Sequence, residues 1–168
     1  MSRLRKKSSL LILLLLCVLA ATGCTLANTP RRSLSELRTA LLNHDADAAL
    51  RYVDVDSIVE NMVRDIFLKY EAKSDDPLAL LGIEAGRQVA KALMPGVKEL
   101  AKNRVKAAIT SPDEGGYFEY VKKGSVWYVD IAADGDTALV KPRGKSDISF
   151  RMKRMADGHW QIVQIIKE

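Results

Sequence analysis

The chain has 168 residues, with 26 Lys and Arg against 21 Asp and Glu and a formal net charge of +5. Four of the cations lie within the first seven residues, and the rest of the chain is almost balanced, so its charge does not indicate nucleic-acid binding. Only two cysteines are present, which excludes a disulfide-rich scaffold. A chain of this length can instead be held by one hydrophobic core.

The N-terminus has the pattern of an export signal. Four basic residues and no acidic residue precede an apolar run from Leu10 to Ala21. As a helix this run would be about 18 Å long, at roughly 1.5 Å per residue, whereas the hydrocarbon core of a bilayer is about 30 Å thick. We therefore predict a signal peptide at residues 1–23 rather than a membrane-spanning helix.

The run ends in Ala21-Thr22-Gly23-Cys24, which resembles the lipobox of bacterial lipoproteins. In that motif small residues precede a cysteine that receives a diacylglyceryl group and becomes the first residue of the mature chain. The resemblance implies acyl chains such as palmitate on Cys24, and a membrane anchor on the periplasmic side of the cell envelope. Because Thr25 rather than aspartate follows the cysteine, the resemblance favours an anchor in the outer membrane where the cell has one. The alternatives are an ordinary signal, cut for example after Ala27, and an uncleaved anchor.

After a tether at residues 24–32, we predict a single domain at residues 33–168 that begins with helices. Ser33 starts a capping-box pattern, S-x-x-E, and Ser57 starts a second one. Apolar residues recur three and four positions apart after both, which is typical of amphipathic helices. A short helix between them is expected, with Asp45 or Asp47 as its cap.

An additional helical segment is predicted around residues 78–109, with a break or kink at Pro95. Gly82 and Gly86 lie four positions apart, so they would share a face and allow a neighbour to approach closely. The favoured interpretation is a helical hairpin that completes the core. The alternatives are a lid over a pocket, the wall of a lipid-binding cavity and a membrane contact. The candidate pocket or interaction residues here are Leu78, Leu81, Val89 and Leu93.

The hydrophobic period becomes alternating after Gly116, which indicates strands. Tight turns are expected at Lys123-Gly124, Asp134-Gly135, Arg143-Gly144 and Asp157-Gly158. We therefore predict an α+β fold, in which N-terminal helices pack on a curved antiparallel sheet of four to five strands with one dry face. The predicted strands are YFEYVKK, SVWYVDI, TALVKP, DISFRMKRM and HWQIVQIIK.

Three segments of the chain resemble the small cone-shaped domains of the nuclear transport factor 2-like superfamily, in particular envelope proteins of that type. They are NHDADAALRYVD, DGDTALV and ISFRMKRMADGHWQIVQI, and the resemblance covers most of residues 33–168. It implies a curved sheet around a long helix, with an apolar pocket at the open end. The segment 78–109 departs from that pattern as a longer helical insert. Members serve as binding modules or as cofactor-free enzymes, so the fold alone does not decide the function.

The chain offers few candidates for catalysis. His44 and His159 both fall at predicted turns, where a solvated or capping role is expected. Tyr128 and Asp130 would share one face of a strand and form the best candidate for an inward polar pair. The favoured interpretation is that both face solvent while Trp127, Val129 and Ile131 form the core.

Metal ligation has no stronger signal. Asp45 with Asp47, and Asp54 with Asp56, form D-x-D pairs, but the glycine turn and terminal glutamate of a calcium loop are missing. Helix capping explains these aspartates, and we predict no cofactor and no catalytic residue. The hypothesis is a lipid-anchored binding module for an apolar small molecule or lipid. The alternatives are an envelope assembly or interaction protein with an exposed apolar patch, and an enzyme that uses a buried Asp130 or His159.

Overall fold

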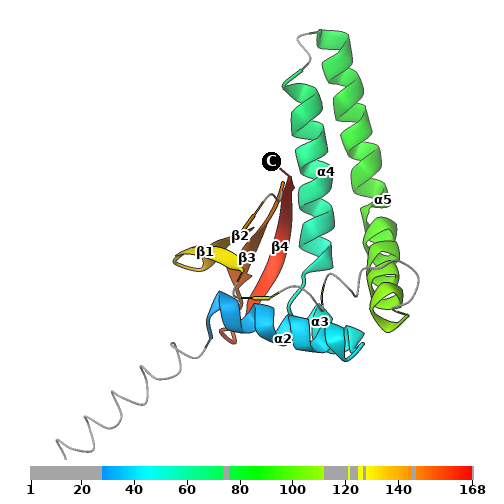
Figure 1. Cartoon of the computed structure of the whole chain (residues 1–168). Coiled ribbons are helices and arrows are strands. Elements are labelled where there is room, and N and C mark those ends of the chain that lie inside the picture. Colours follow the sequence, from blue (N-terminus) through cyan, green and yellow to red (C-terminus); the bar gives the residue numbers. More distant parts are fainter. Residues whose placement is uncertain are drawn as a thin grey trace, which may run out of the picture.

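The computed structural model describes residues 28–73, 76–111, 121, 125–126, 128–144 and 147–167. Helices precede an antiparallel sheet, which confirms the predicted α+β class (Figure 1). The predicted signal, Cys24 and all but one residue of the predicted strand at 117–123 lie outside the described residues. The elements are α2 (Pro30–Leu42), α3 (Ala46–Leu50), α4 (Val55–Glu71), α5 (Pro77–Thr110), β1 (Val129–Asp134), β2 (Thr137–Pro142), β3 (Ile148–Arg154) and β4 (Trp160–Lys167).

The four strands lie in the order β1-β2-β3-β4, each antiparallel to the next. Gly135, Gly144 and Gly158 lie between successive strands with φ values of 56°, 115° and 90°, a region that glycine adopts without a steric penalty. Three of the four predicted turns are therefore confirmed, and Lys123-Gly124 lies outside the described residues. Within the predicted strand SVWYVDI, strand β1 starts at Val129 rather than at Ser125.

The register of the strands builds the dry face of the sheet. Val140 pairs with Phe150, and Phe150 pairs with Ile165, so three apolar side chains form one row across the sheet. A bulge opposite Arg151 shifts the register of β4. Because of this extra residue, Ile162 and Ile165 both lie on the dry face, although three positions separate them.

The core lies between this face and the N-terminal helices. Trp160, Met152 and Val140 are the largest side chains that are fully buried. The helices bring a stripe of buried residues to the same cluster, and α2 and α3 run crosswise at the lower end of the sheet and of the α4–α5 pair in Figure 1. The helical members of the cluster are Leu37, Ala40, Ala46, Ala49, Ile58 and Ile109.

The start of the domain is held by Trp160. Its indole Nε1 donates a hydrogen bond to the carbonyl oxygen of Asn28 at 3.0 Å, and its backbone N–H donates to the Ser33 hydroxyl at 2.9 Å. Ser33 is buried and does not cap a helix, so the first capping-box prediction was wrong. Helix α2 begins at Pro30, inside the predicted tether, and Thr29 caps it by accepting a hydrogen bond from the backbone N–H of Arg32.

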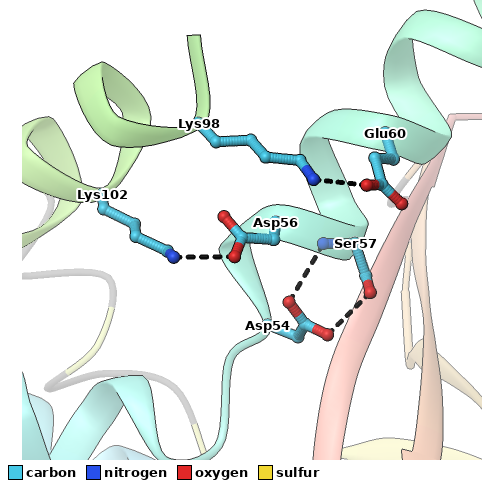
Figure 2. Close-up of polar contacts among 6 residues, drawn as sticks. All are labelled: Asp54, Asp56, Ser57, Glu60, Lys98 and Lys102. Carbon is cyan, nitrogen blue, oxygen red and sulfur yellow. Dashed lines mark hydrogen bonds and ion pairs between the residues drawn. The ribbon is translucent and has the colours of Figure 1, made fainter. Parts of the chain in front are cut away.

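The second capping-box prediction was also wrong. Asp54 caps α4, because its carboxylate accepts hydrogen bonds from the backbone N–H of Ser57 at 3.0 Å and from the Ser57 hydroxyl at 2.6 Å (Figure 2). The Ser57 hydroxyl is a donor in this arrangement. The predicted cap Asp45 is confirmed for α3, where it accepts from the backbone N–H of Ala48 at 2.9 Å.

Helices α4 and α5 form an antiparallel hairpin that extends past the sheet (Figure 1). The hairpin starts beside β4, where Val53 forms a parallel bridge with Ile162. Helix α5 is continuous through Pro95 rather than divided in two. A Cβ at Gly86 would lie 3.5 Å from the Phe67 ring, so the close approach predicted from glycine occurs there, whereas nothing lies within 4 Å at Gly82.

Candidate functional site

A partly open apolar cavity of about 630 Å³ lies between the N-terminal helices, the C-terminal end of α5 and the dry face of the sheet. Its volume falls in the range of pockets that hold small-molecule ligands. Its lining residues among those described are Leu34, Leu37, Arg38, Leu41, Ala49, Leu50, Val53, Val55, Ile58, Val105, Ala108, Ile109, Val121, Ser125, Val126, Val129, Val140, Phe150, Ile162 and Ile165.

Two sequence periodicities build the two walls of this cavity. On α2, Leu34, Leu37 and Leu41 recur three and four positions apart and so share one face. On the sheet, the row of Val140, Phe150 and Ile165 supplies the opposite wall. The cavity therefore lies where a helical stripe and a strand face of the same hydrophobic character meet.

Arg38 and Ser125 are the only polar residues among the described residues of the lining. The Arg38 guanidinium donates a hydrogen bond through Nε to the carbonyl oxygen of Val121 at 3.3 Å. Arg31, about two turns earlier on α2, donates to the carbonyl oxygens of Val126 and of Val129. The two arginines thus connect α2 to the start of β1 and to the chain before it, at the margin of the cavity.

The predicted residues of the long helix do not line this cavity. Leu78, Leu81, Val89 and Leu93 lie on the hairpin with exposed fractions of 76%, 68%, 59% and 60%. They lie outside this cavity, and an apolar helix sequence does not specify which of its faces meets the core. Their prediction as interaction residues is compatible with this exposure and stays a prediction.

Tyr128 and Asp130 are exposed, as the favoured interpretation of the sequence expected. The Asp130 carboxylate accepts hydrogen bonds from the Arg143 guanidinium at 2.7 Å, on the side of the sheet away from the cavity. Val129 and Ile131 pack against the core, and Trp127 lies outside the described residues. The structure thus brings Asp130 to a cation rather than to a cavity.

Both histidines lie at turns and outside the cavity lining. His44 has a φ of 57°, and its Nδ1 lies 3.2 Å from the carbonyl oxygen of Ile109. His159 hydrogen-bonds through Nδ1 to the Asp157 carboxylate and forms a T-shaped pair with the Tyr52 ring, with 5.8 Å between the ring centroids. Burial alone would raise the pKa of Asp157, but the hydrogen bonds from His159 hold it below its usual value.

The four aspartates of the D-x-D pairs are used for capping and ion pairing. Asp45 and Asp54 cap helices, Asp47 pairs with Lys106 at 2.8 Å, and Asp56 pairs with Lys102 at 2.7 Å (Figure 2). Within the part of the chain that the structure describes, no three His, Cys, Asp or Glu side chains are grouped so that they could hold a metal ion.

The cavity residues on the sheet follow the alternating apolar pattern of the predicted strands. Val129, Val140 and Phe150 occupy alternating positions of predicted strands, and the prediction assigned such positions to the dry face only. Val53, between α3 and α4, belongs to no periodic pattern, so the sequence does not indicate that it lines a cavity. Comparison of the chain with protein-family models, with curated proteins and with solved structures found no match.

Proposed function

We propose that this protein is a lipid-anchored bacterial envelope protein that binds an apolar small molecule or a lipid. The observation that carries the proposal is the cavity of about 630 Å³ with an apolar lining. A ligand that leaves water for such a surface gains roughly 25 cal/mol for each Å² of apolar area that is buried. The ligand class that fits is therefore one with little polar surface, such as an acyl chain.

The proposed location rests on the lipobox-like sequence at residues 21–24 and on the cone-shaped superfamily that residues 33–168 resemble. Among the described residues, no helix is long and apolar enough to cross a bilayer. Acyl chains on Cys24 would supply the membrane attachment, at about 0.8 kcal/mol per buried methylene. Palmitate release from the purified protein, and its loss in Cys24→Ala, would test this part of the proposal directly.

Native mass spectrometry on a chain that begins at Thr25, before and after solvent extraction, tests the ligand. Ile165 lines the cavity and is 40% exposed, so Ile165→Glu places a charge in the wall without emptying the core. The matched control is Ile148→Glu, because Ile148 is 44% exposed on the neighbouring strand and is outside the lining. We expect a co-purified apolar mass that Ile165→Glu loses and Ile148→Glu keeps.

The binding proposal fails if the chain carries no such mass and also takes up nothing from an extract of envelope lipids. Equal loss of the bound mass in both variants would also contradict it, because the site would then lie elsewhere. A circular dichroism melt of each variant separates loss of binding from loss of fold.

An envelope interaction protein is the second candidate function. The observation that favours it is the large amount of apolar surface on the α4–α5 hairpin, where side chains such as Leu78 and Leu100 are more than half exposed. Contiguous apolar patches on soluble proteins are typical of interaction sites. The two functions use different surfaces, so one protein can perform both.

A further inference from the structure

Ion pairs join the two helices of the hairpin along one of its faces. Lys98 pairs with Glu60, and Lys102 pairs with Asp56 at 2.7 Å (Figure 2). Nearer the tip, Arg87 pairs with Glu71. The hydrogen bond with Glu60 raises the pKa of the Lys98 ammonium, so this pair stays charged over the physiological range.

The opposite side of the hairpin is apolar. Residues two positions apart on an α-helix point about 200° away from each other, since each residue turns by about 100°. Leu100 lies two positions from both Lys98 and Lys102, and Val89 lies two positions from Arg87. Six side chains that are each more than half exposed form this surface, which we call the hairpin face: Met62, Ile66, Tyr70, Val89, Leu93 and Leu100.

The hairpin face is at the small end of the size range of protein interfaces, because two such faces together would bury about 1,200 Å² against a range of about 1,200–2,000 Å². A large side chain that is half exposed presents about 100 Å² of apolar surface, so the six together present about 600 Å². A standard protein–protein interface buries about 800 Å² on each partner. Lys69 and Arg104 lie at the margins of the face and would form part of a polar rim.

Two observations favour a protein over a bilayer as the occupant. Interfacial helices that bind membranes are rich in Lys and Arg on the polar side, whereas three acidic side chains here neutralise three basic ones. The chain also enters the domain at Asn28, which Trp160 holds at the start of β4, while α4 runs away from that end beside β4 (Figure 1). An anchor that precedes Asn28 would thus attach the end opposite the hairpin tip.

We infer that the hairpin face of one copy packs on the hairpin face of a second copy. The face has no charged residue among its six members, so two identical faces meet without electrostatic repulsion. A two-fold axis brings each such face against itself. Four helices then enclose a shared apolar layer, which is the arrangement of a four-helix bundle. The cavity plays no part in this contact.

Disulfide cross-linking in intact cells that make the full chain tests this dimer. Leu93→Cys and Val89→Cys place a thiol on the hairpin face, and Lys91→Cys and Arg64→Cys are the matched controls on the other side. Because disulfides form only when Cα atoms approach within about 7 Å, we expect about ten-fold more dimer from the face positions than from the controls. The chain without an added cysteine sets the background of Cys17 and Cys24.

A second substitution checks that the contact is apolar. In the Val89→Cys chain, Leu93→Glu should abolish the cross-link, and Lys91→Glu should leave it. Equal cross-linking on both sides, or background levels at every position, would overturn the inference. The inference would also be overturned if cross-linking stays at background while the Leu93→Cys thiol is protected from a water-soluble maleimide. That result would assign the hairpin face to a lipid surface. Loss of the cavity ligand in Ile165→Glu has no bearing on these outcomes.

Discussion

The backbone N–H of Trp160 donates a 2.9 Å hydrogen bond to the hydroxyl of Ser33, across 127 positions of sequence. Both residues are buried, so no water replaces this bond when the hydroxyl is removed. We expect Ser33→Ala to lower the free energy of unfolding by about 1–3 kcal/mol, because a buried donor is left without an acceptor. Urea denaturation measures the change. Ser35→Ala, an exposed site on the same helix, is the control and should stay near wild type.

Gly158 adopts a φ of 90°, and a Cβ there would lie 2.7 Å from the Asn28 side-chain nitrogen. We expect Gly158→Ala to destabilise the fold by about 1–3 kcal/mol, through backbone strain together with displacement of Asn28. Gly135→Ala is the control, because its φ is also positive but nothing lies within 4 Å. If thermal melts show the same loss in both variants, the contact with Asn28 contributes nothing.

Asp54 rather than Ser57 caps α4. Asp54→Ala removes the acceptor for a backbone N–H and should cost about 1–2 kcal/mol of stability. Ser57→Ala removes only a hydroxyl that donates to the same carboxylate, so its effect should be smaller. The two values come from matched urea denaturation curves. A larger cost for Ser57→Ala would restore the capping-box assignment.

The acid side of the stability profile should depend on Asp157, whose pKa the hydrogen bonds from His159 hold below the usual value despite the opposing effect of burial. A lowered carboxyl pKa adds stability above the unfolded pKa of about 3.9, and this stability is lost as the pH falls through the folded pKa. We therefore expect wild type to melt above Asp157→Asn at pH 6 and the difference to shrink below about pH 4. In a His159→Ala background the difference should be smaller, because the side-chain hydrogen bond is lost while the backbone N–H at position 159 still donates to Asp157. A difference that does not change with pH would contradict this assignment.

The sequence predicted the order and type of the elements because each has a clear hydrophobic period, as in the stripe of Leu34, Leu37 and Leu41. It predicted the cap Asp45 of α3 correctly, but it assigned the caps of α2 and α4 to Ser33 and Ser57 rather than to Thr29 and Asp54. The pattern S-x-x-E does not distinguish a serine that caps a helix from a serine that is buried against a strand. Ser33 is of the second kind, because its hydroxyl accepts a hydrogen bond from the backbone N–H of Trp160. That pairing joins opposite ends of the chain and leaves no local signal.

The candidate residues that the sequence offered on α5 do not line the cavity. Helix α5 is apolar on more than one side, so its sequence allows Val89 or Leu93 to face a core, a partner or solvent. In the observed rotation of α5, Lys98 and Lys102 meet Glu60 and Asp56 of α4. Their partners lie about 40 positions away, and no single segment reveals them.

If Cys24 carries acyl chains as proposed, the hydrogen bond from Trp160 to Asn28 also limits how far the domain can move from the membrane. Four residue steps separate Asn28 from Cys24, and a fully extended chain spans at most about 3.6 Å per residue, or about 14 Å in total. With acyl chains on Cys24, the cavity would therefore remain in a thin layer above the headgroups. It would exchange its contents with that bilayer, or with molecules that come to it, and would not ferry them between two membranes.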